Sequence, residues 1–265
     1  MNKPILEVKK LTMNFGGLRA INSLDLSINQ GEIAALIGPN GAGKTTFFNC
    51  ITGIYTPTRG DVFVRPNGDD ATKERINGLK PNLVTRKGLA RTFQNIRLFA
   101  SMTVLENVMI GCYPVTKAGI LGAIFRGPTT RAEEQFIVDK SYGILKKIGL
   151  ETYVDELALN LPYGAQRRLE IARAMATDPF LLLLDEPAAG MNPKETQALN
   201  ELILKLRDEE QISILLIEHD MKLVMSLSEN IFVVDYGKKI GEGTPDQILN
   251  NPVVIKAYLG EEIDA

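Results

Sequence analysis

The stretch Gly38-Pro39-Asn40-Gly41-Ala42-Gly43-Lys44-Thr45-Thr46 fits the phosphate-binding pattern G-x-x-x-x-G-K-[ST] at every fixed position. The apolar run before it, residues 32–37, is predicted to be a buried strand, and Phe47 to Thr52 is predicted to continue as a helix. Glycines let successive backbone N–H groups point inward at the positive end of such a helix. The stretch therefore predicts a polyphosphate site in an α/β fold. The alternative is a glycine-rich turn that only connects strand to helix.

Side chains at two predicted strand ends are expected to carry the chemistry of that site. Lys44 is expected to reach the terminal phosphates as a point charge, and the Thr45 hydroxyl is expected to bind Mg²⁺. Leu181–Leu184 predicts a second buried strand, which ends in Asp185 and Glu186. Ligands bind at the carboxyl ends of strands in open α/β sheets. Asp185 is therefore predicted to hold Mg²⁺, and Glu186 to polarise a water for attack on the γ-phosphate.

The composition is that of an ordinary globular protein of 265 residues, long enough for one large α/β domain or two small ones. No apolar run reaches the roughly 18 residues of a transmembrane helix, and the start lacks a secretory pattern, so we expect a cytoplasmic chain that does not span a membrane. Cys50 and Cys112 lie far apart without metal-ligand spacing and are predicted to be reduced core thiols. A formal net charge of −2 without a basic excess argues against a nucleic-acid partner.

The N-terminal region predicts two half-buried antiparallel strands, Ile5 to Leu11 and Leu24 to Ile28, around a turn at Gly16-Gly17. Phe15 lies just before that turn. An aromatic ring upstream of a phosphate-binding loop could stack on an adenine, or it could plug a strand end, and its position leaves the two readings even.

The middle of the chain changes character. Residues 65–87 are rich in turn formers and are predicted to form a surface loop, and Leu89 to Phe93 is predicted to be a strand that ends at Gln94. A capping box, Thr103 to Glu106, then starts a helix, and the chain stays mainly helical. This shift predicts a helical subdomain inserted at roughly residues 95 to 175.

The C-terminal region returns to the pattern of strands and helices. Asn192 is predicted to cap a helix that runs to about Arg207, and Ile212–Ile217 is predicted to be a buried strand. The only histidine, His219, follows that strand, and a lone histidine is usually a structural one. A second capping box at Thr244 predicts a final helical segment.

The order of these features resembles the nucleotide-binding subunits of ABC transporters across nearly the whole chain. The features are the glycine-rich loop, Gln94 at a strand end, the stretch Leu161-Pro162-Tyr163-Gly164-Ala165-Gln166-Arg167-Arg168, Asp185-Glu186 and His219. The resemblance implies a P-loop NTPase core of the RecA-like type with an N-terminal antiparallel β subdomain and an inserted α-helical subdomain. We therefore expect one domain over residues 1–265, with its core at about 1–94 and 176–245, the helical subdomain at about 95–175 and a helical tail at about 245–265.

The resemblance also implies a role for each site residue, with ATP as the ligand and Mg²⁺ as its metal. Gln94 occupies the place of the Q-loop residue, expected both to assist catalysis and to bind Mg²⁺ beside Thr45 and Asp185. Glu186 takes the place of the catalytic base and His219 that of the switch histidine, with Lys44 as a further catalytic group. The implied ATP-binding residues are Phe15, Gly38, Pro39, Asn40, Gly41, Ala42, Gly43, Lys44, Thr45, Thr46 and, acting on the ATP of a second subunit, Gly164 in the signature stretch Leu161–Ala165.

Several stretches are similar to one branch of the family, the LivG-type ATP-binding subunits of branched-chain amino acid importers. They are residues 90–99, 167–176, 185–196, 217–225 and 235–240. The resemblance implies a peripheral ATP hydrolase at the cytoplasmic face of the inner membrane. Its expected partners are a second ATP-binding subunit, identical or different, transmembrane permease subunits that dock near Asn95 to Phe99, and indirectly a substrate-binding protein. The alternatives are the ATPase of a lipid or polysaccharide exporter, an ABC ATPase acting on the ribosome or on DNA, and a nucleotide-binding regulator without hydrolysis.

The signature stretch departs from the usual LSGGQ pattern. Pro162 stands where a serine usually offers a hydroxyl to ATP, and Ala165 replaces the glutamine. Asn192 occupies the place of the usual D-loop aspartate. Because proline has neither a hydroxyl nor a backbone N–H, we expect the ATP site that faces this signature to turn over more slowly than its twin.

Overall fold

The computed structural model describes residues 4–113 and 128–259 of the chain. Two sheets dominate it. A four-stranded antiparallel sheet has the order β2-β1-β4-β5, and a six-stranded sheet has the order β10-β9-β3-β8-β7-β6. Their strands are β1 (Leu6–Phe15), β2 (Leu18–Ile28), β3 (Ile33–Ile37), β4 (Arg59–Val64), β5 (Glu74–Arg75), β6 (Leu89–Arg91), β7 (Leu181–Asp185), β8 (Ser213–Ile217), β9 (Asn230–Asp235) and β10 (Lys238–Gly243).

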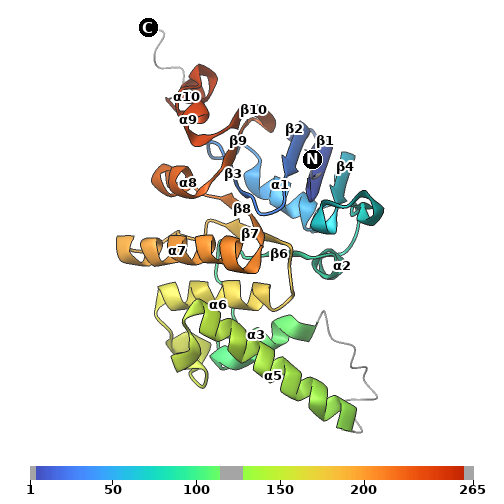
Figure 1. Ribbon diagram of the computed structural model, residues 1–265. Coiled ribbons are helices and arrows are strands. Elements are labelled where there is room, and N and C mark those ends of the chain that lie inside the picture. The colour runs from blue at the N-terminus through green and yellow to red at the C-terminus, as the bar shows by residue number, and fades with distance from the viewer. Residues whose placement is uncertain (1–3, 114–127, 260–265) are drawn as a thin grey trace.

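The helices cover both faces of the six-stranded sheet. Figure 1 shows α7 and then α6, α3 and α5 stacked on one side, with α1 and the four-stranded sheet on the other. The described helices are α1 (Lys44–Ile51), α2 (Pro81–Arg86), α3 (Val104–Cys112), α5 (Pro128–Ile148), α6 (Tyr163–Met175), α7 (Pro193–Glu210), α8 (Met221–Leu227), α9 (Pro245–Leu249) and α10 (Pro252–Leu259). Among the described residues, none of these helices combines the length and the apolar character needed to cross a membrane.

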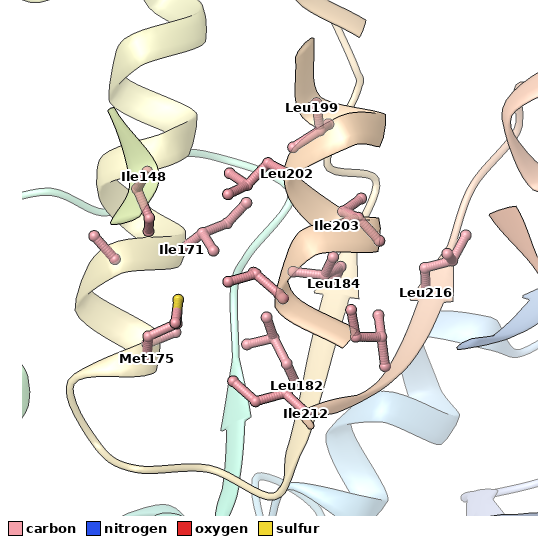
Figure 2. Close-up of a cluster of buried hydrophobic side chains, with 14 of the residues drawn as sticks. Ile148, Ile171, Met175, Leu182, Leu184, Leu199, Leu202, Ile203, Ile212 and Leu216 are labelled. Carbon is pink, nitrogen blue, oxygen red and sulfur yellow. The ribbon is translucent and has the colours of Figure 1, made fainter. Parts of the chain in front are cut away.

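The central strands of the six-stranded sheet are covered on both faces. Every residue of β3, β7 and β8 is buried, as expected for strands covered on both faces. Alternate residues serve opposite cores: Leu182 and Leu184 pack with α6 and α7, whereas Leu181 and Leu183 pack toward α1 and the antiparallel sheet. Figure 2 shows the first core, where side chains of α6, α7, β7 and β8 interdigitate. This packing on both faces fixes the positions of β3, β7 and β8 relative to one another, and with them the carboxyl ends of these strands.

The predicted antiparallel pair at the N-terminus is confirmed, with β1 and β2 paired along their length. The capping boxes at Thr103, Asn192 and Thr244 all form. Cys50 and Cys112 are free and buried, as predicted. The α/β fold class, with one antiparallel sheet and one mainly parallel sheet, is therefore what the sequence indicated.

Three local predictions were wrong in their limits. The helix after the glycine-rich loop begins at Lys44 rather than at Phe47, since the left-handed backbone of Gly43 (φ 104°) turns the chain directly into it. The predicted surface loop 65–87 contains β5 and α2. The strand predicted to end at Gln94 ends at Arg91, because the backbone of residues 93–97 bonds to side chains of α6 instead of to β7.

The division into core, helical subdomain and tail stays a prediction. The structure places α3, α5 and α6 within the span predicted to be the helical subdomain, and these three helices pack on one another. Residues 114–127 of that span and residues 260–265 of the predicted tail lie outside the described residues.

Candidate functional site

The glycine-rich loop connects β3 to α1 and is held by close backbone contacts. A Cβ atom on Gly43 would lie 2.5 Å from the carbonyl oxygen of Ala20 on β2, and one on Gly237, in the turn between β9 and β10, would lie 2.6 Å from the same oxygen. Gly237 also donates its N–H to the Ala42 carbonyl (3.0 Å) and accepts from the N–H of Asn22 (2.8 Å). These contacts join the loop, the antiparallel sheet and the β9–β10 turn at one point that leaves no room for side chains.

Lys44 lies at the start of α1 with its ammonium directed back into the loop. Its Nζ donates to the carbonyl oxygens of Gly38 (2.6 Å) and Pro39 (2.9 Å). Burial lowers the pKa of Lys44, while the carboxylates of Glu186 and Asp185 act in the opposite direction. A cation held this way, beside a helix N-terminus, is suited to bind phosphate oxygens in place of the two carbonyls.

A cavity of about 490 Å³ opens in front of this loop. The structure brings most of the predicted site residues to its wall, far apart as they are in the sequence. The lining residues are Phe15, Leu18, Arg19, Ala20, Asn40, Gly41, Ala42, Gly43, Lys44, Thr45, Thr46, Gln94, Glu186, His219 and Tyr236. A larger cavity of about 750 Å³ lies on β1, β2 and β4, but none of the predicted site residues lines it. We therefore take the smaller cavity as the candidate site.

Glu186 lies at the centre of the reactive groups. Its Oε2 accepts from Gln94 Nε2 at 2.7 Å, and its Oε1 lies 3.0 Å from His219 Nε2. The three side chains follow β6, β7 and β8, so the shared edge of the parallel sheet brings them together. Glu186 has a left-handed backbone (φ 49°), which is strained for a residue with a side chain.

Phe15, the last residue of β1, also lines the cavity. The ring is 41% exposed and packs edge-on against Tyr55, with centroids 5.2 Å apart. Half-exposure leaves ring surface available for stacking, so the adenine role stays a prediction that the placement permits.

Asp185, a predicted site residue, makes an ion pair that the sequence did not indicate. It is buried (3% exposed) and its Oδ2 accepts from Arg91 Nη2 at 2.7 Å. Arg91 also donates to Asn49 Oδ1 at 2.7 Å on α1 and lies over the rings of Phe48 and Phe93. In the sequence, Arg91 lies in one predicted strand and Asp185 at the end of another. That pattern alone does not predict a contact between them.

The residues proposed for Mg²⁺ fit the preference of that ion for oxygen ligands. Thr45 and Gln94, which line the cavity, carry a hydroxyl and an amide oxygen, and Asp185 carries a buried carboxylate. In the described ranges, no group of three or more His, Cys, Asp or Glu residues could hold a metal. A magnesium ion here would depend on these mixed oxygen ligands and on phosphate oxygens of the nucleotide.

Gly164 does not line the cavity. It is the second residue of α6, is buried, and a Cβ there would lie 2.8 Å from Oε1 of Glu195. Pro162 is the N-cap of α6, makes no side-chain capping bond, and accepts from the N–H of Ala165 with its carbonyl. Tyr163 donates from its hydroxyl to the carbonyl of Ala189, after β7. A contact between Gly164 and ATP therefore requires a second subunit and stays a prediction.

Glu218 is a functional candidate that the sequence reading missed. Its buried carboxylate accepts from the N–H of Ala188 at 2.8 Å and from that of His219 at 3.1 Å. It thereby ties the segment after Glu186 to the segment that carries His219. The sequence feature that could have pointed to Glu218 is its position next to the lone histidine, directly after a predicted buried strand.

Comparisons with known proteins agree on one family. Residues 21–189 match the ABC transporter family model, and residues 238–264 match the model of the branched-chain amino acid ATP-binding cassette transporter. The chain is 49% identical to the high-affinity branched-chain amino acid transport ATP-binding proteins LivG of Escherichia coli (strain K12) and BraF of Pseudomonas aeruginosa, over 98% of this chain and 100% of each relative. A solved nucleotide-free ATP-binding cassette from an ABC transporter superposes with a TM-score of 0.82 at 31% identity, covering 97% of this chain and 100% of that chain.

Replacing Glu218 by glutamine is expected to change how stability depends on pH. Burial, as the main cause, raises the pKa of Glu218 above its ordinary value of 4.5, although three backbone N–H groups oppose this. Above pH 4.5 the folded state therefore binds more protons than the unfolded state. The free energy of unfolding of the wild type consequently falls as the pH rises toward the raised pKa of Glu218. Glu218→Gln should become more stable relative to wild type as the pH is raised from below 4.5 toward the raised pKa of Glu218, measured by urea unfolding. A difference that stays constant over this range would contradict the prediction.

Proposed function

Because the chain belongs to the ABC transporter family, whose cassettes bind and hydrolyse ATP, we propose that it powers the uptake of branched-chain amino acids through partner permease subunits. Identity of 49% over the full length of LivG and BraF supports this substrate class. The match of the C-terminal residues to the branched-chain amino acid transporter model supports it independently of the ATPase core. The protein would act peripherally at the cytoplasmic face of the membrane, where permease and ATP meet.

The contact of Glu186 with both Gln94 and His219, beside a phosphate-binding loop, carries the proposed mechanism. Each carboxylate oxygen has a second lone pair, so Glu186 could accept a proton from an attacking water while keeping both partners. Gln94 and His219 would orient the carboxylate and contact the γ-phosphate side of the cavity.

The remaining site residues would bind and orient ATP. Phe15 would stack on the adenine, and the N–H groups of residues 38–46 would bind the phosphates together with Lys44. Thr45, Gln94 and Asp185 would hold Mg²⁺, which would supply positive charge that stabilises the negative charge developing on the phosphates.

A second ATP-binding subunit, identical or different, would complete the site. One cavity leaves the γ-phosphate open to water on one side. The N-terminus of α6 of the partner, with its Gly164, would add N–H groups there. Closing and reopening of such a pair would move the permease. The ATPase of a lipid or polysaccharide exporter is the second candidate, because the transported substrate is recognised by other subunits.

Glu186→Gln is expected to lower ATP turnover on the order of 10²-fold or more while sparing ATP binding, since the amide cannot accept the proton of the attacking water. Phosphate release and nucleotide binding would be measured on the same preparations. Glu209→Gln on the exposed side of α7 is the matched control and should behave as wild type. Unchanged turnover in Glu186→Gln would remove Glu186 from its proposed role.

Pro162→Ser is expected to raise turnover, because a serine at the N-cap of α6 supplies the hydroxyl that the proline lacks. The same hydroxyl would cap the helix and add roughly 1 kcal/mol of stability, so thermal unfolding is measured separately. If ATPase and transport rates stay at wild-type level, the idea of a slower site fails.

Affinity purification of the tagged full chain from its own membranes should bring down permease subunits, identified by mass spectrometry. Deleting the gene should abolish uptake of labelled leucine, isoleucine or valine, and the wild-type chain should restore it. Normal uptake in the deletion strain, or copurification of an exporter, would favour the second candidate.

A further inference from the structure

We propose that a buried ion pair on α6, Arg167 with Glu170, positions Gln94 against Glu186 and makes the start of α6 move together with Gln94. This inference rests on the proposed role of Gln94 in hydrolysis. It assigns both ion-pair residues as positioning residues, since neither lines the cavity.

Arg167 holds two successive carbonyl groups with one guanidinium. Its Nη1 donates to the Phe93 carbonyl at 2.6 Å, and its Nη2 donates to the Gln94 carbonyl. Nη1 also lies 3.1 Å from Glu170 Oε2, and both side chains are 2% exposed. A planar fork with donors in fixed directions can bridge neighbouring carbonyls, which the single ammonium of a lysine cannot do.

Glu170 holds the same segment through its N–H groups. Its Oε1 accepts from the N–H of Phe93 at 3.4 Å and from that of Arg97 at 3.3 Å. The Arg97 guanidinium in turn stacks over the Phe93 ring, 4.3 Å from its centroid. The pair therefore bonds backbone N–H groups on both sides of Gln94 and the carbonyl groups of Phe93 and Gln94 itself.

This arrangement, and not strand pairing, determines where Gln94 lies. The last backbone bond to β7 is from Thr92 to the Leu183 carbonyl, at 2.9 Å. Beyond Thr92 the chain follows α6, and the Gln94 side chain reaches Glu186 from there. A buried ion pair adds little net stability compared with apolar side chains of the same size, so stabilising the fold is a weak reason for its presence.

The same helix carries Gly164 in its first turn, within six residues of Glu170. A regular helix transmits a displacement of its first turn to its second with little loss. In a pair of subunits, a partner's ATP that pulls on the start of α6 would therefore shift Gln94 at the subunit's own site. The ion pair is the physical connection between the two ATP sites.

The test is a double-mutant cycle on the full chain, reading ATP turnover at saturating ATP and ATP affinity. Arg167→Met combined with Glu170→Leu removes the ion pair while keeping side-chain volume, and is expected to fold. Turnover should fall on the order of tenfold to a hundredfold because Gln94 is misplaced, with ATP affinity unchanged. Adding Gln94→Ala to this variant should change turnover by less than about twofold, because the two changes act as one unit.

Arg168→Met is the matched control, since Arg168 lies next to Arg167 on α6 but donates to the Ile148 carbonyl instead. Its effect should add to that of Gln94→Ala. Arg167→Lys, which keeps the charge but not the fork, should lose part of the turnover, and it replaces the double variant if that melts early. Amide exchange at Phe93 and Arg97 should become faster in the double variant but not in Arg168→Met.

The outcomes separate the inference from the proposed function. If Gln94→Ala alone leaves turnover unchanged, the proposed role of Gln94 fails, and amide exchange still decides whether the pair holds the segment. If Gln94→Ala lowers turnover while the double variant stays at wild-type level, or if the effects simply add, the inference is overturned.

Discussion

The hydrogen bonds on the Glu186 carboxylate depend first on the alignment of two neighbouring strands. Glu186 and His219 are distant in the sequence and meet because β7 and β8 end in register, with Asp185 paired to Ile217, while Arg167 and Glu170 hold the segment after β6 that brings Gln94 to them. That register is maintained by two apolar layers, one on each face of the sheet. A strand shifted by one residue would exchange its two faces and remove its functional side chain from the site. The chemistry is thus a consequence of how the core packs.

Three ionisable side chains of the site already have partners within the chain. Lys44 bonds to carbonyl groups of its own loop, Asp185 to Arg91, and Glu186 to Gln94 and His219. Leaving such groups buried and unpaired would cost the desolvation energy of each. In the proposed mechanism, ATP binding would be an exchange of partners, in which phosphate oxygens replace the carbonyl oxygens of Gly38 and Pro39 on Lys44.

Local patterns in the sequence were enough to predict much of this molecule. The glycine-rich loop, the apolar strands ending in acids, the capping boxes at Thr103 and Thr244 and the helix cap at Asn192 depend on neighbours in the chain, and all appear where expected. The Arg91–Asp185 ion pair could not be predicted, because its two residues are 94 positions apart in the sequence. The bond from Arg167 to the Phe93 carbonyl spans 74 positions and could not be predicted either. The early end of β6 at Arg91 has the same origin. Side chains of α6, which is distant in the sequence, bond to the backbone of Phe93 and Gln94, where the strand was predicted to continue.

The contacts of Gly43 and Gly237 with Ala20 have a consequence for which ligands fit. They tie the antiparallel sheet, and with it Phe15 at the end of β1, to the loop that carries Lys44. Backbone packing therefore fixes where the backbone of Phe15 lies relative to the glycine-rich loop. In the proposed ATP complex, this packing would limit the span between a ring stacked on the adenine and the phosphates bound by the loop.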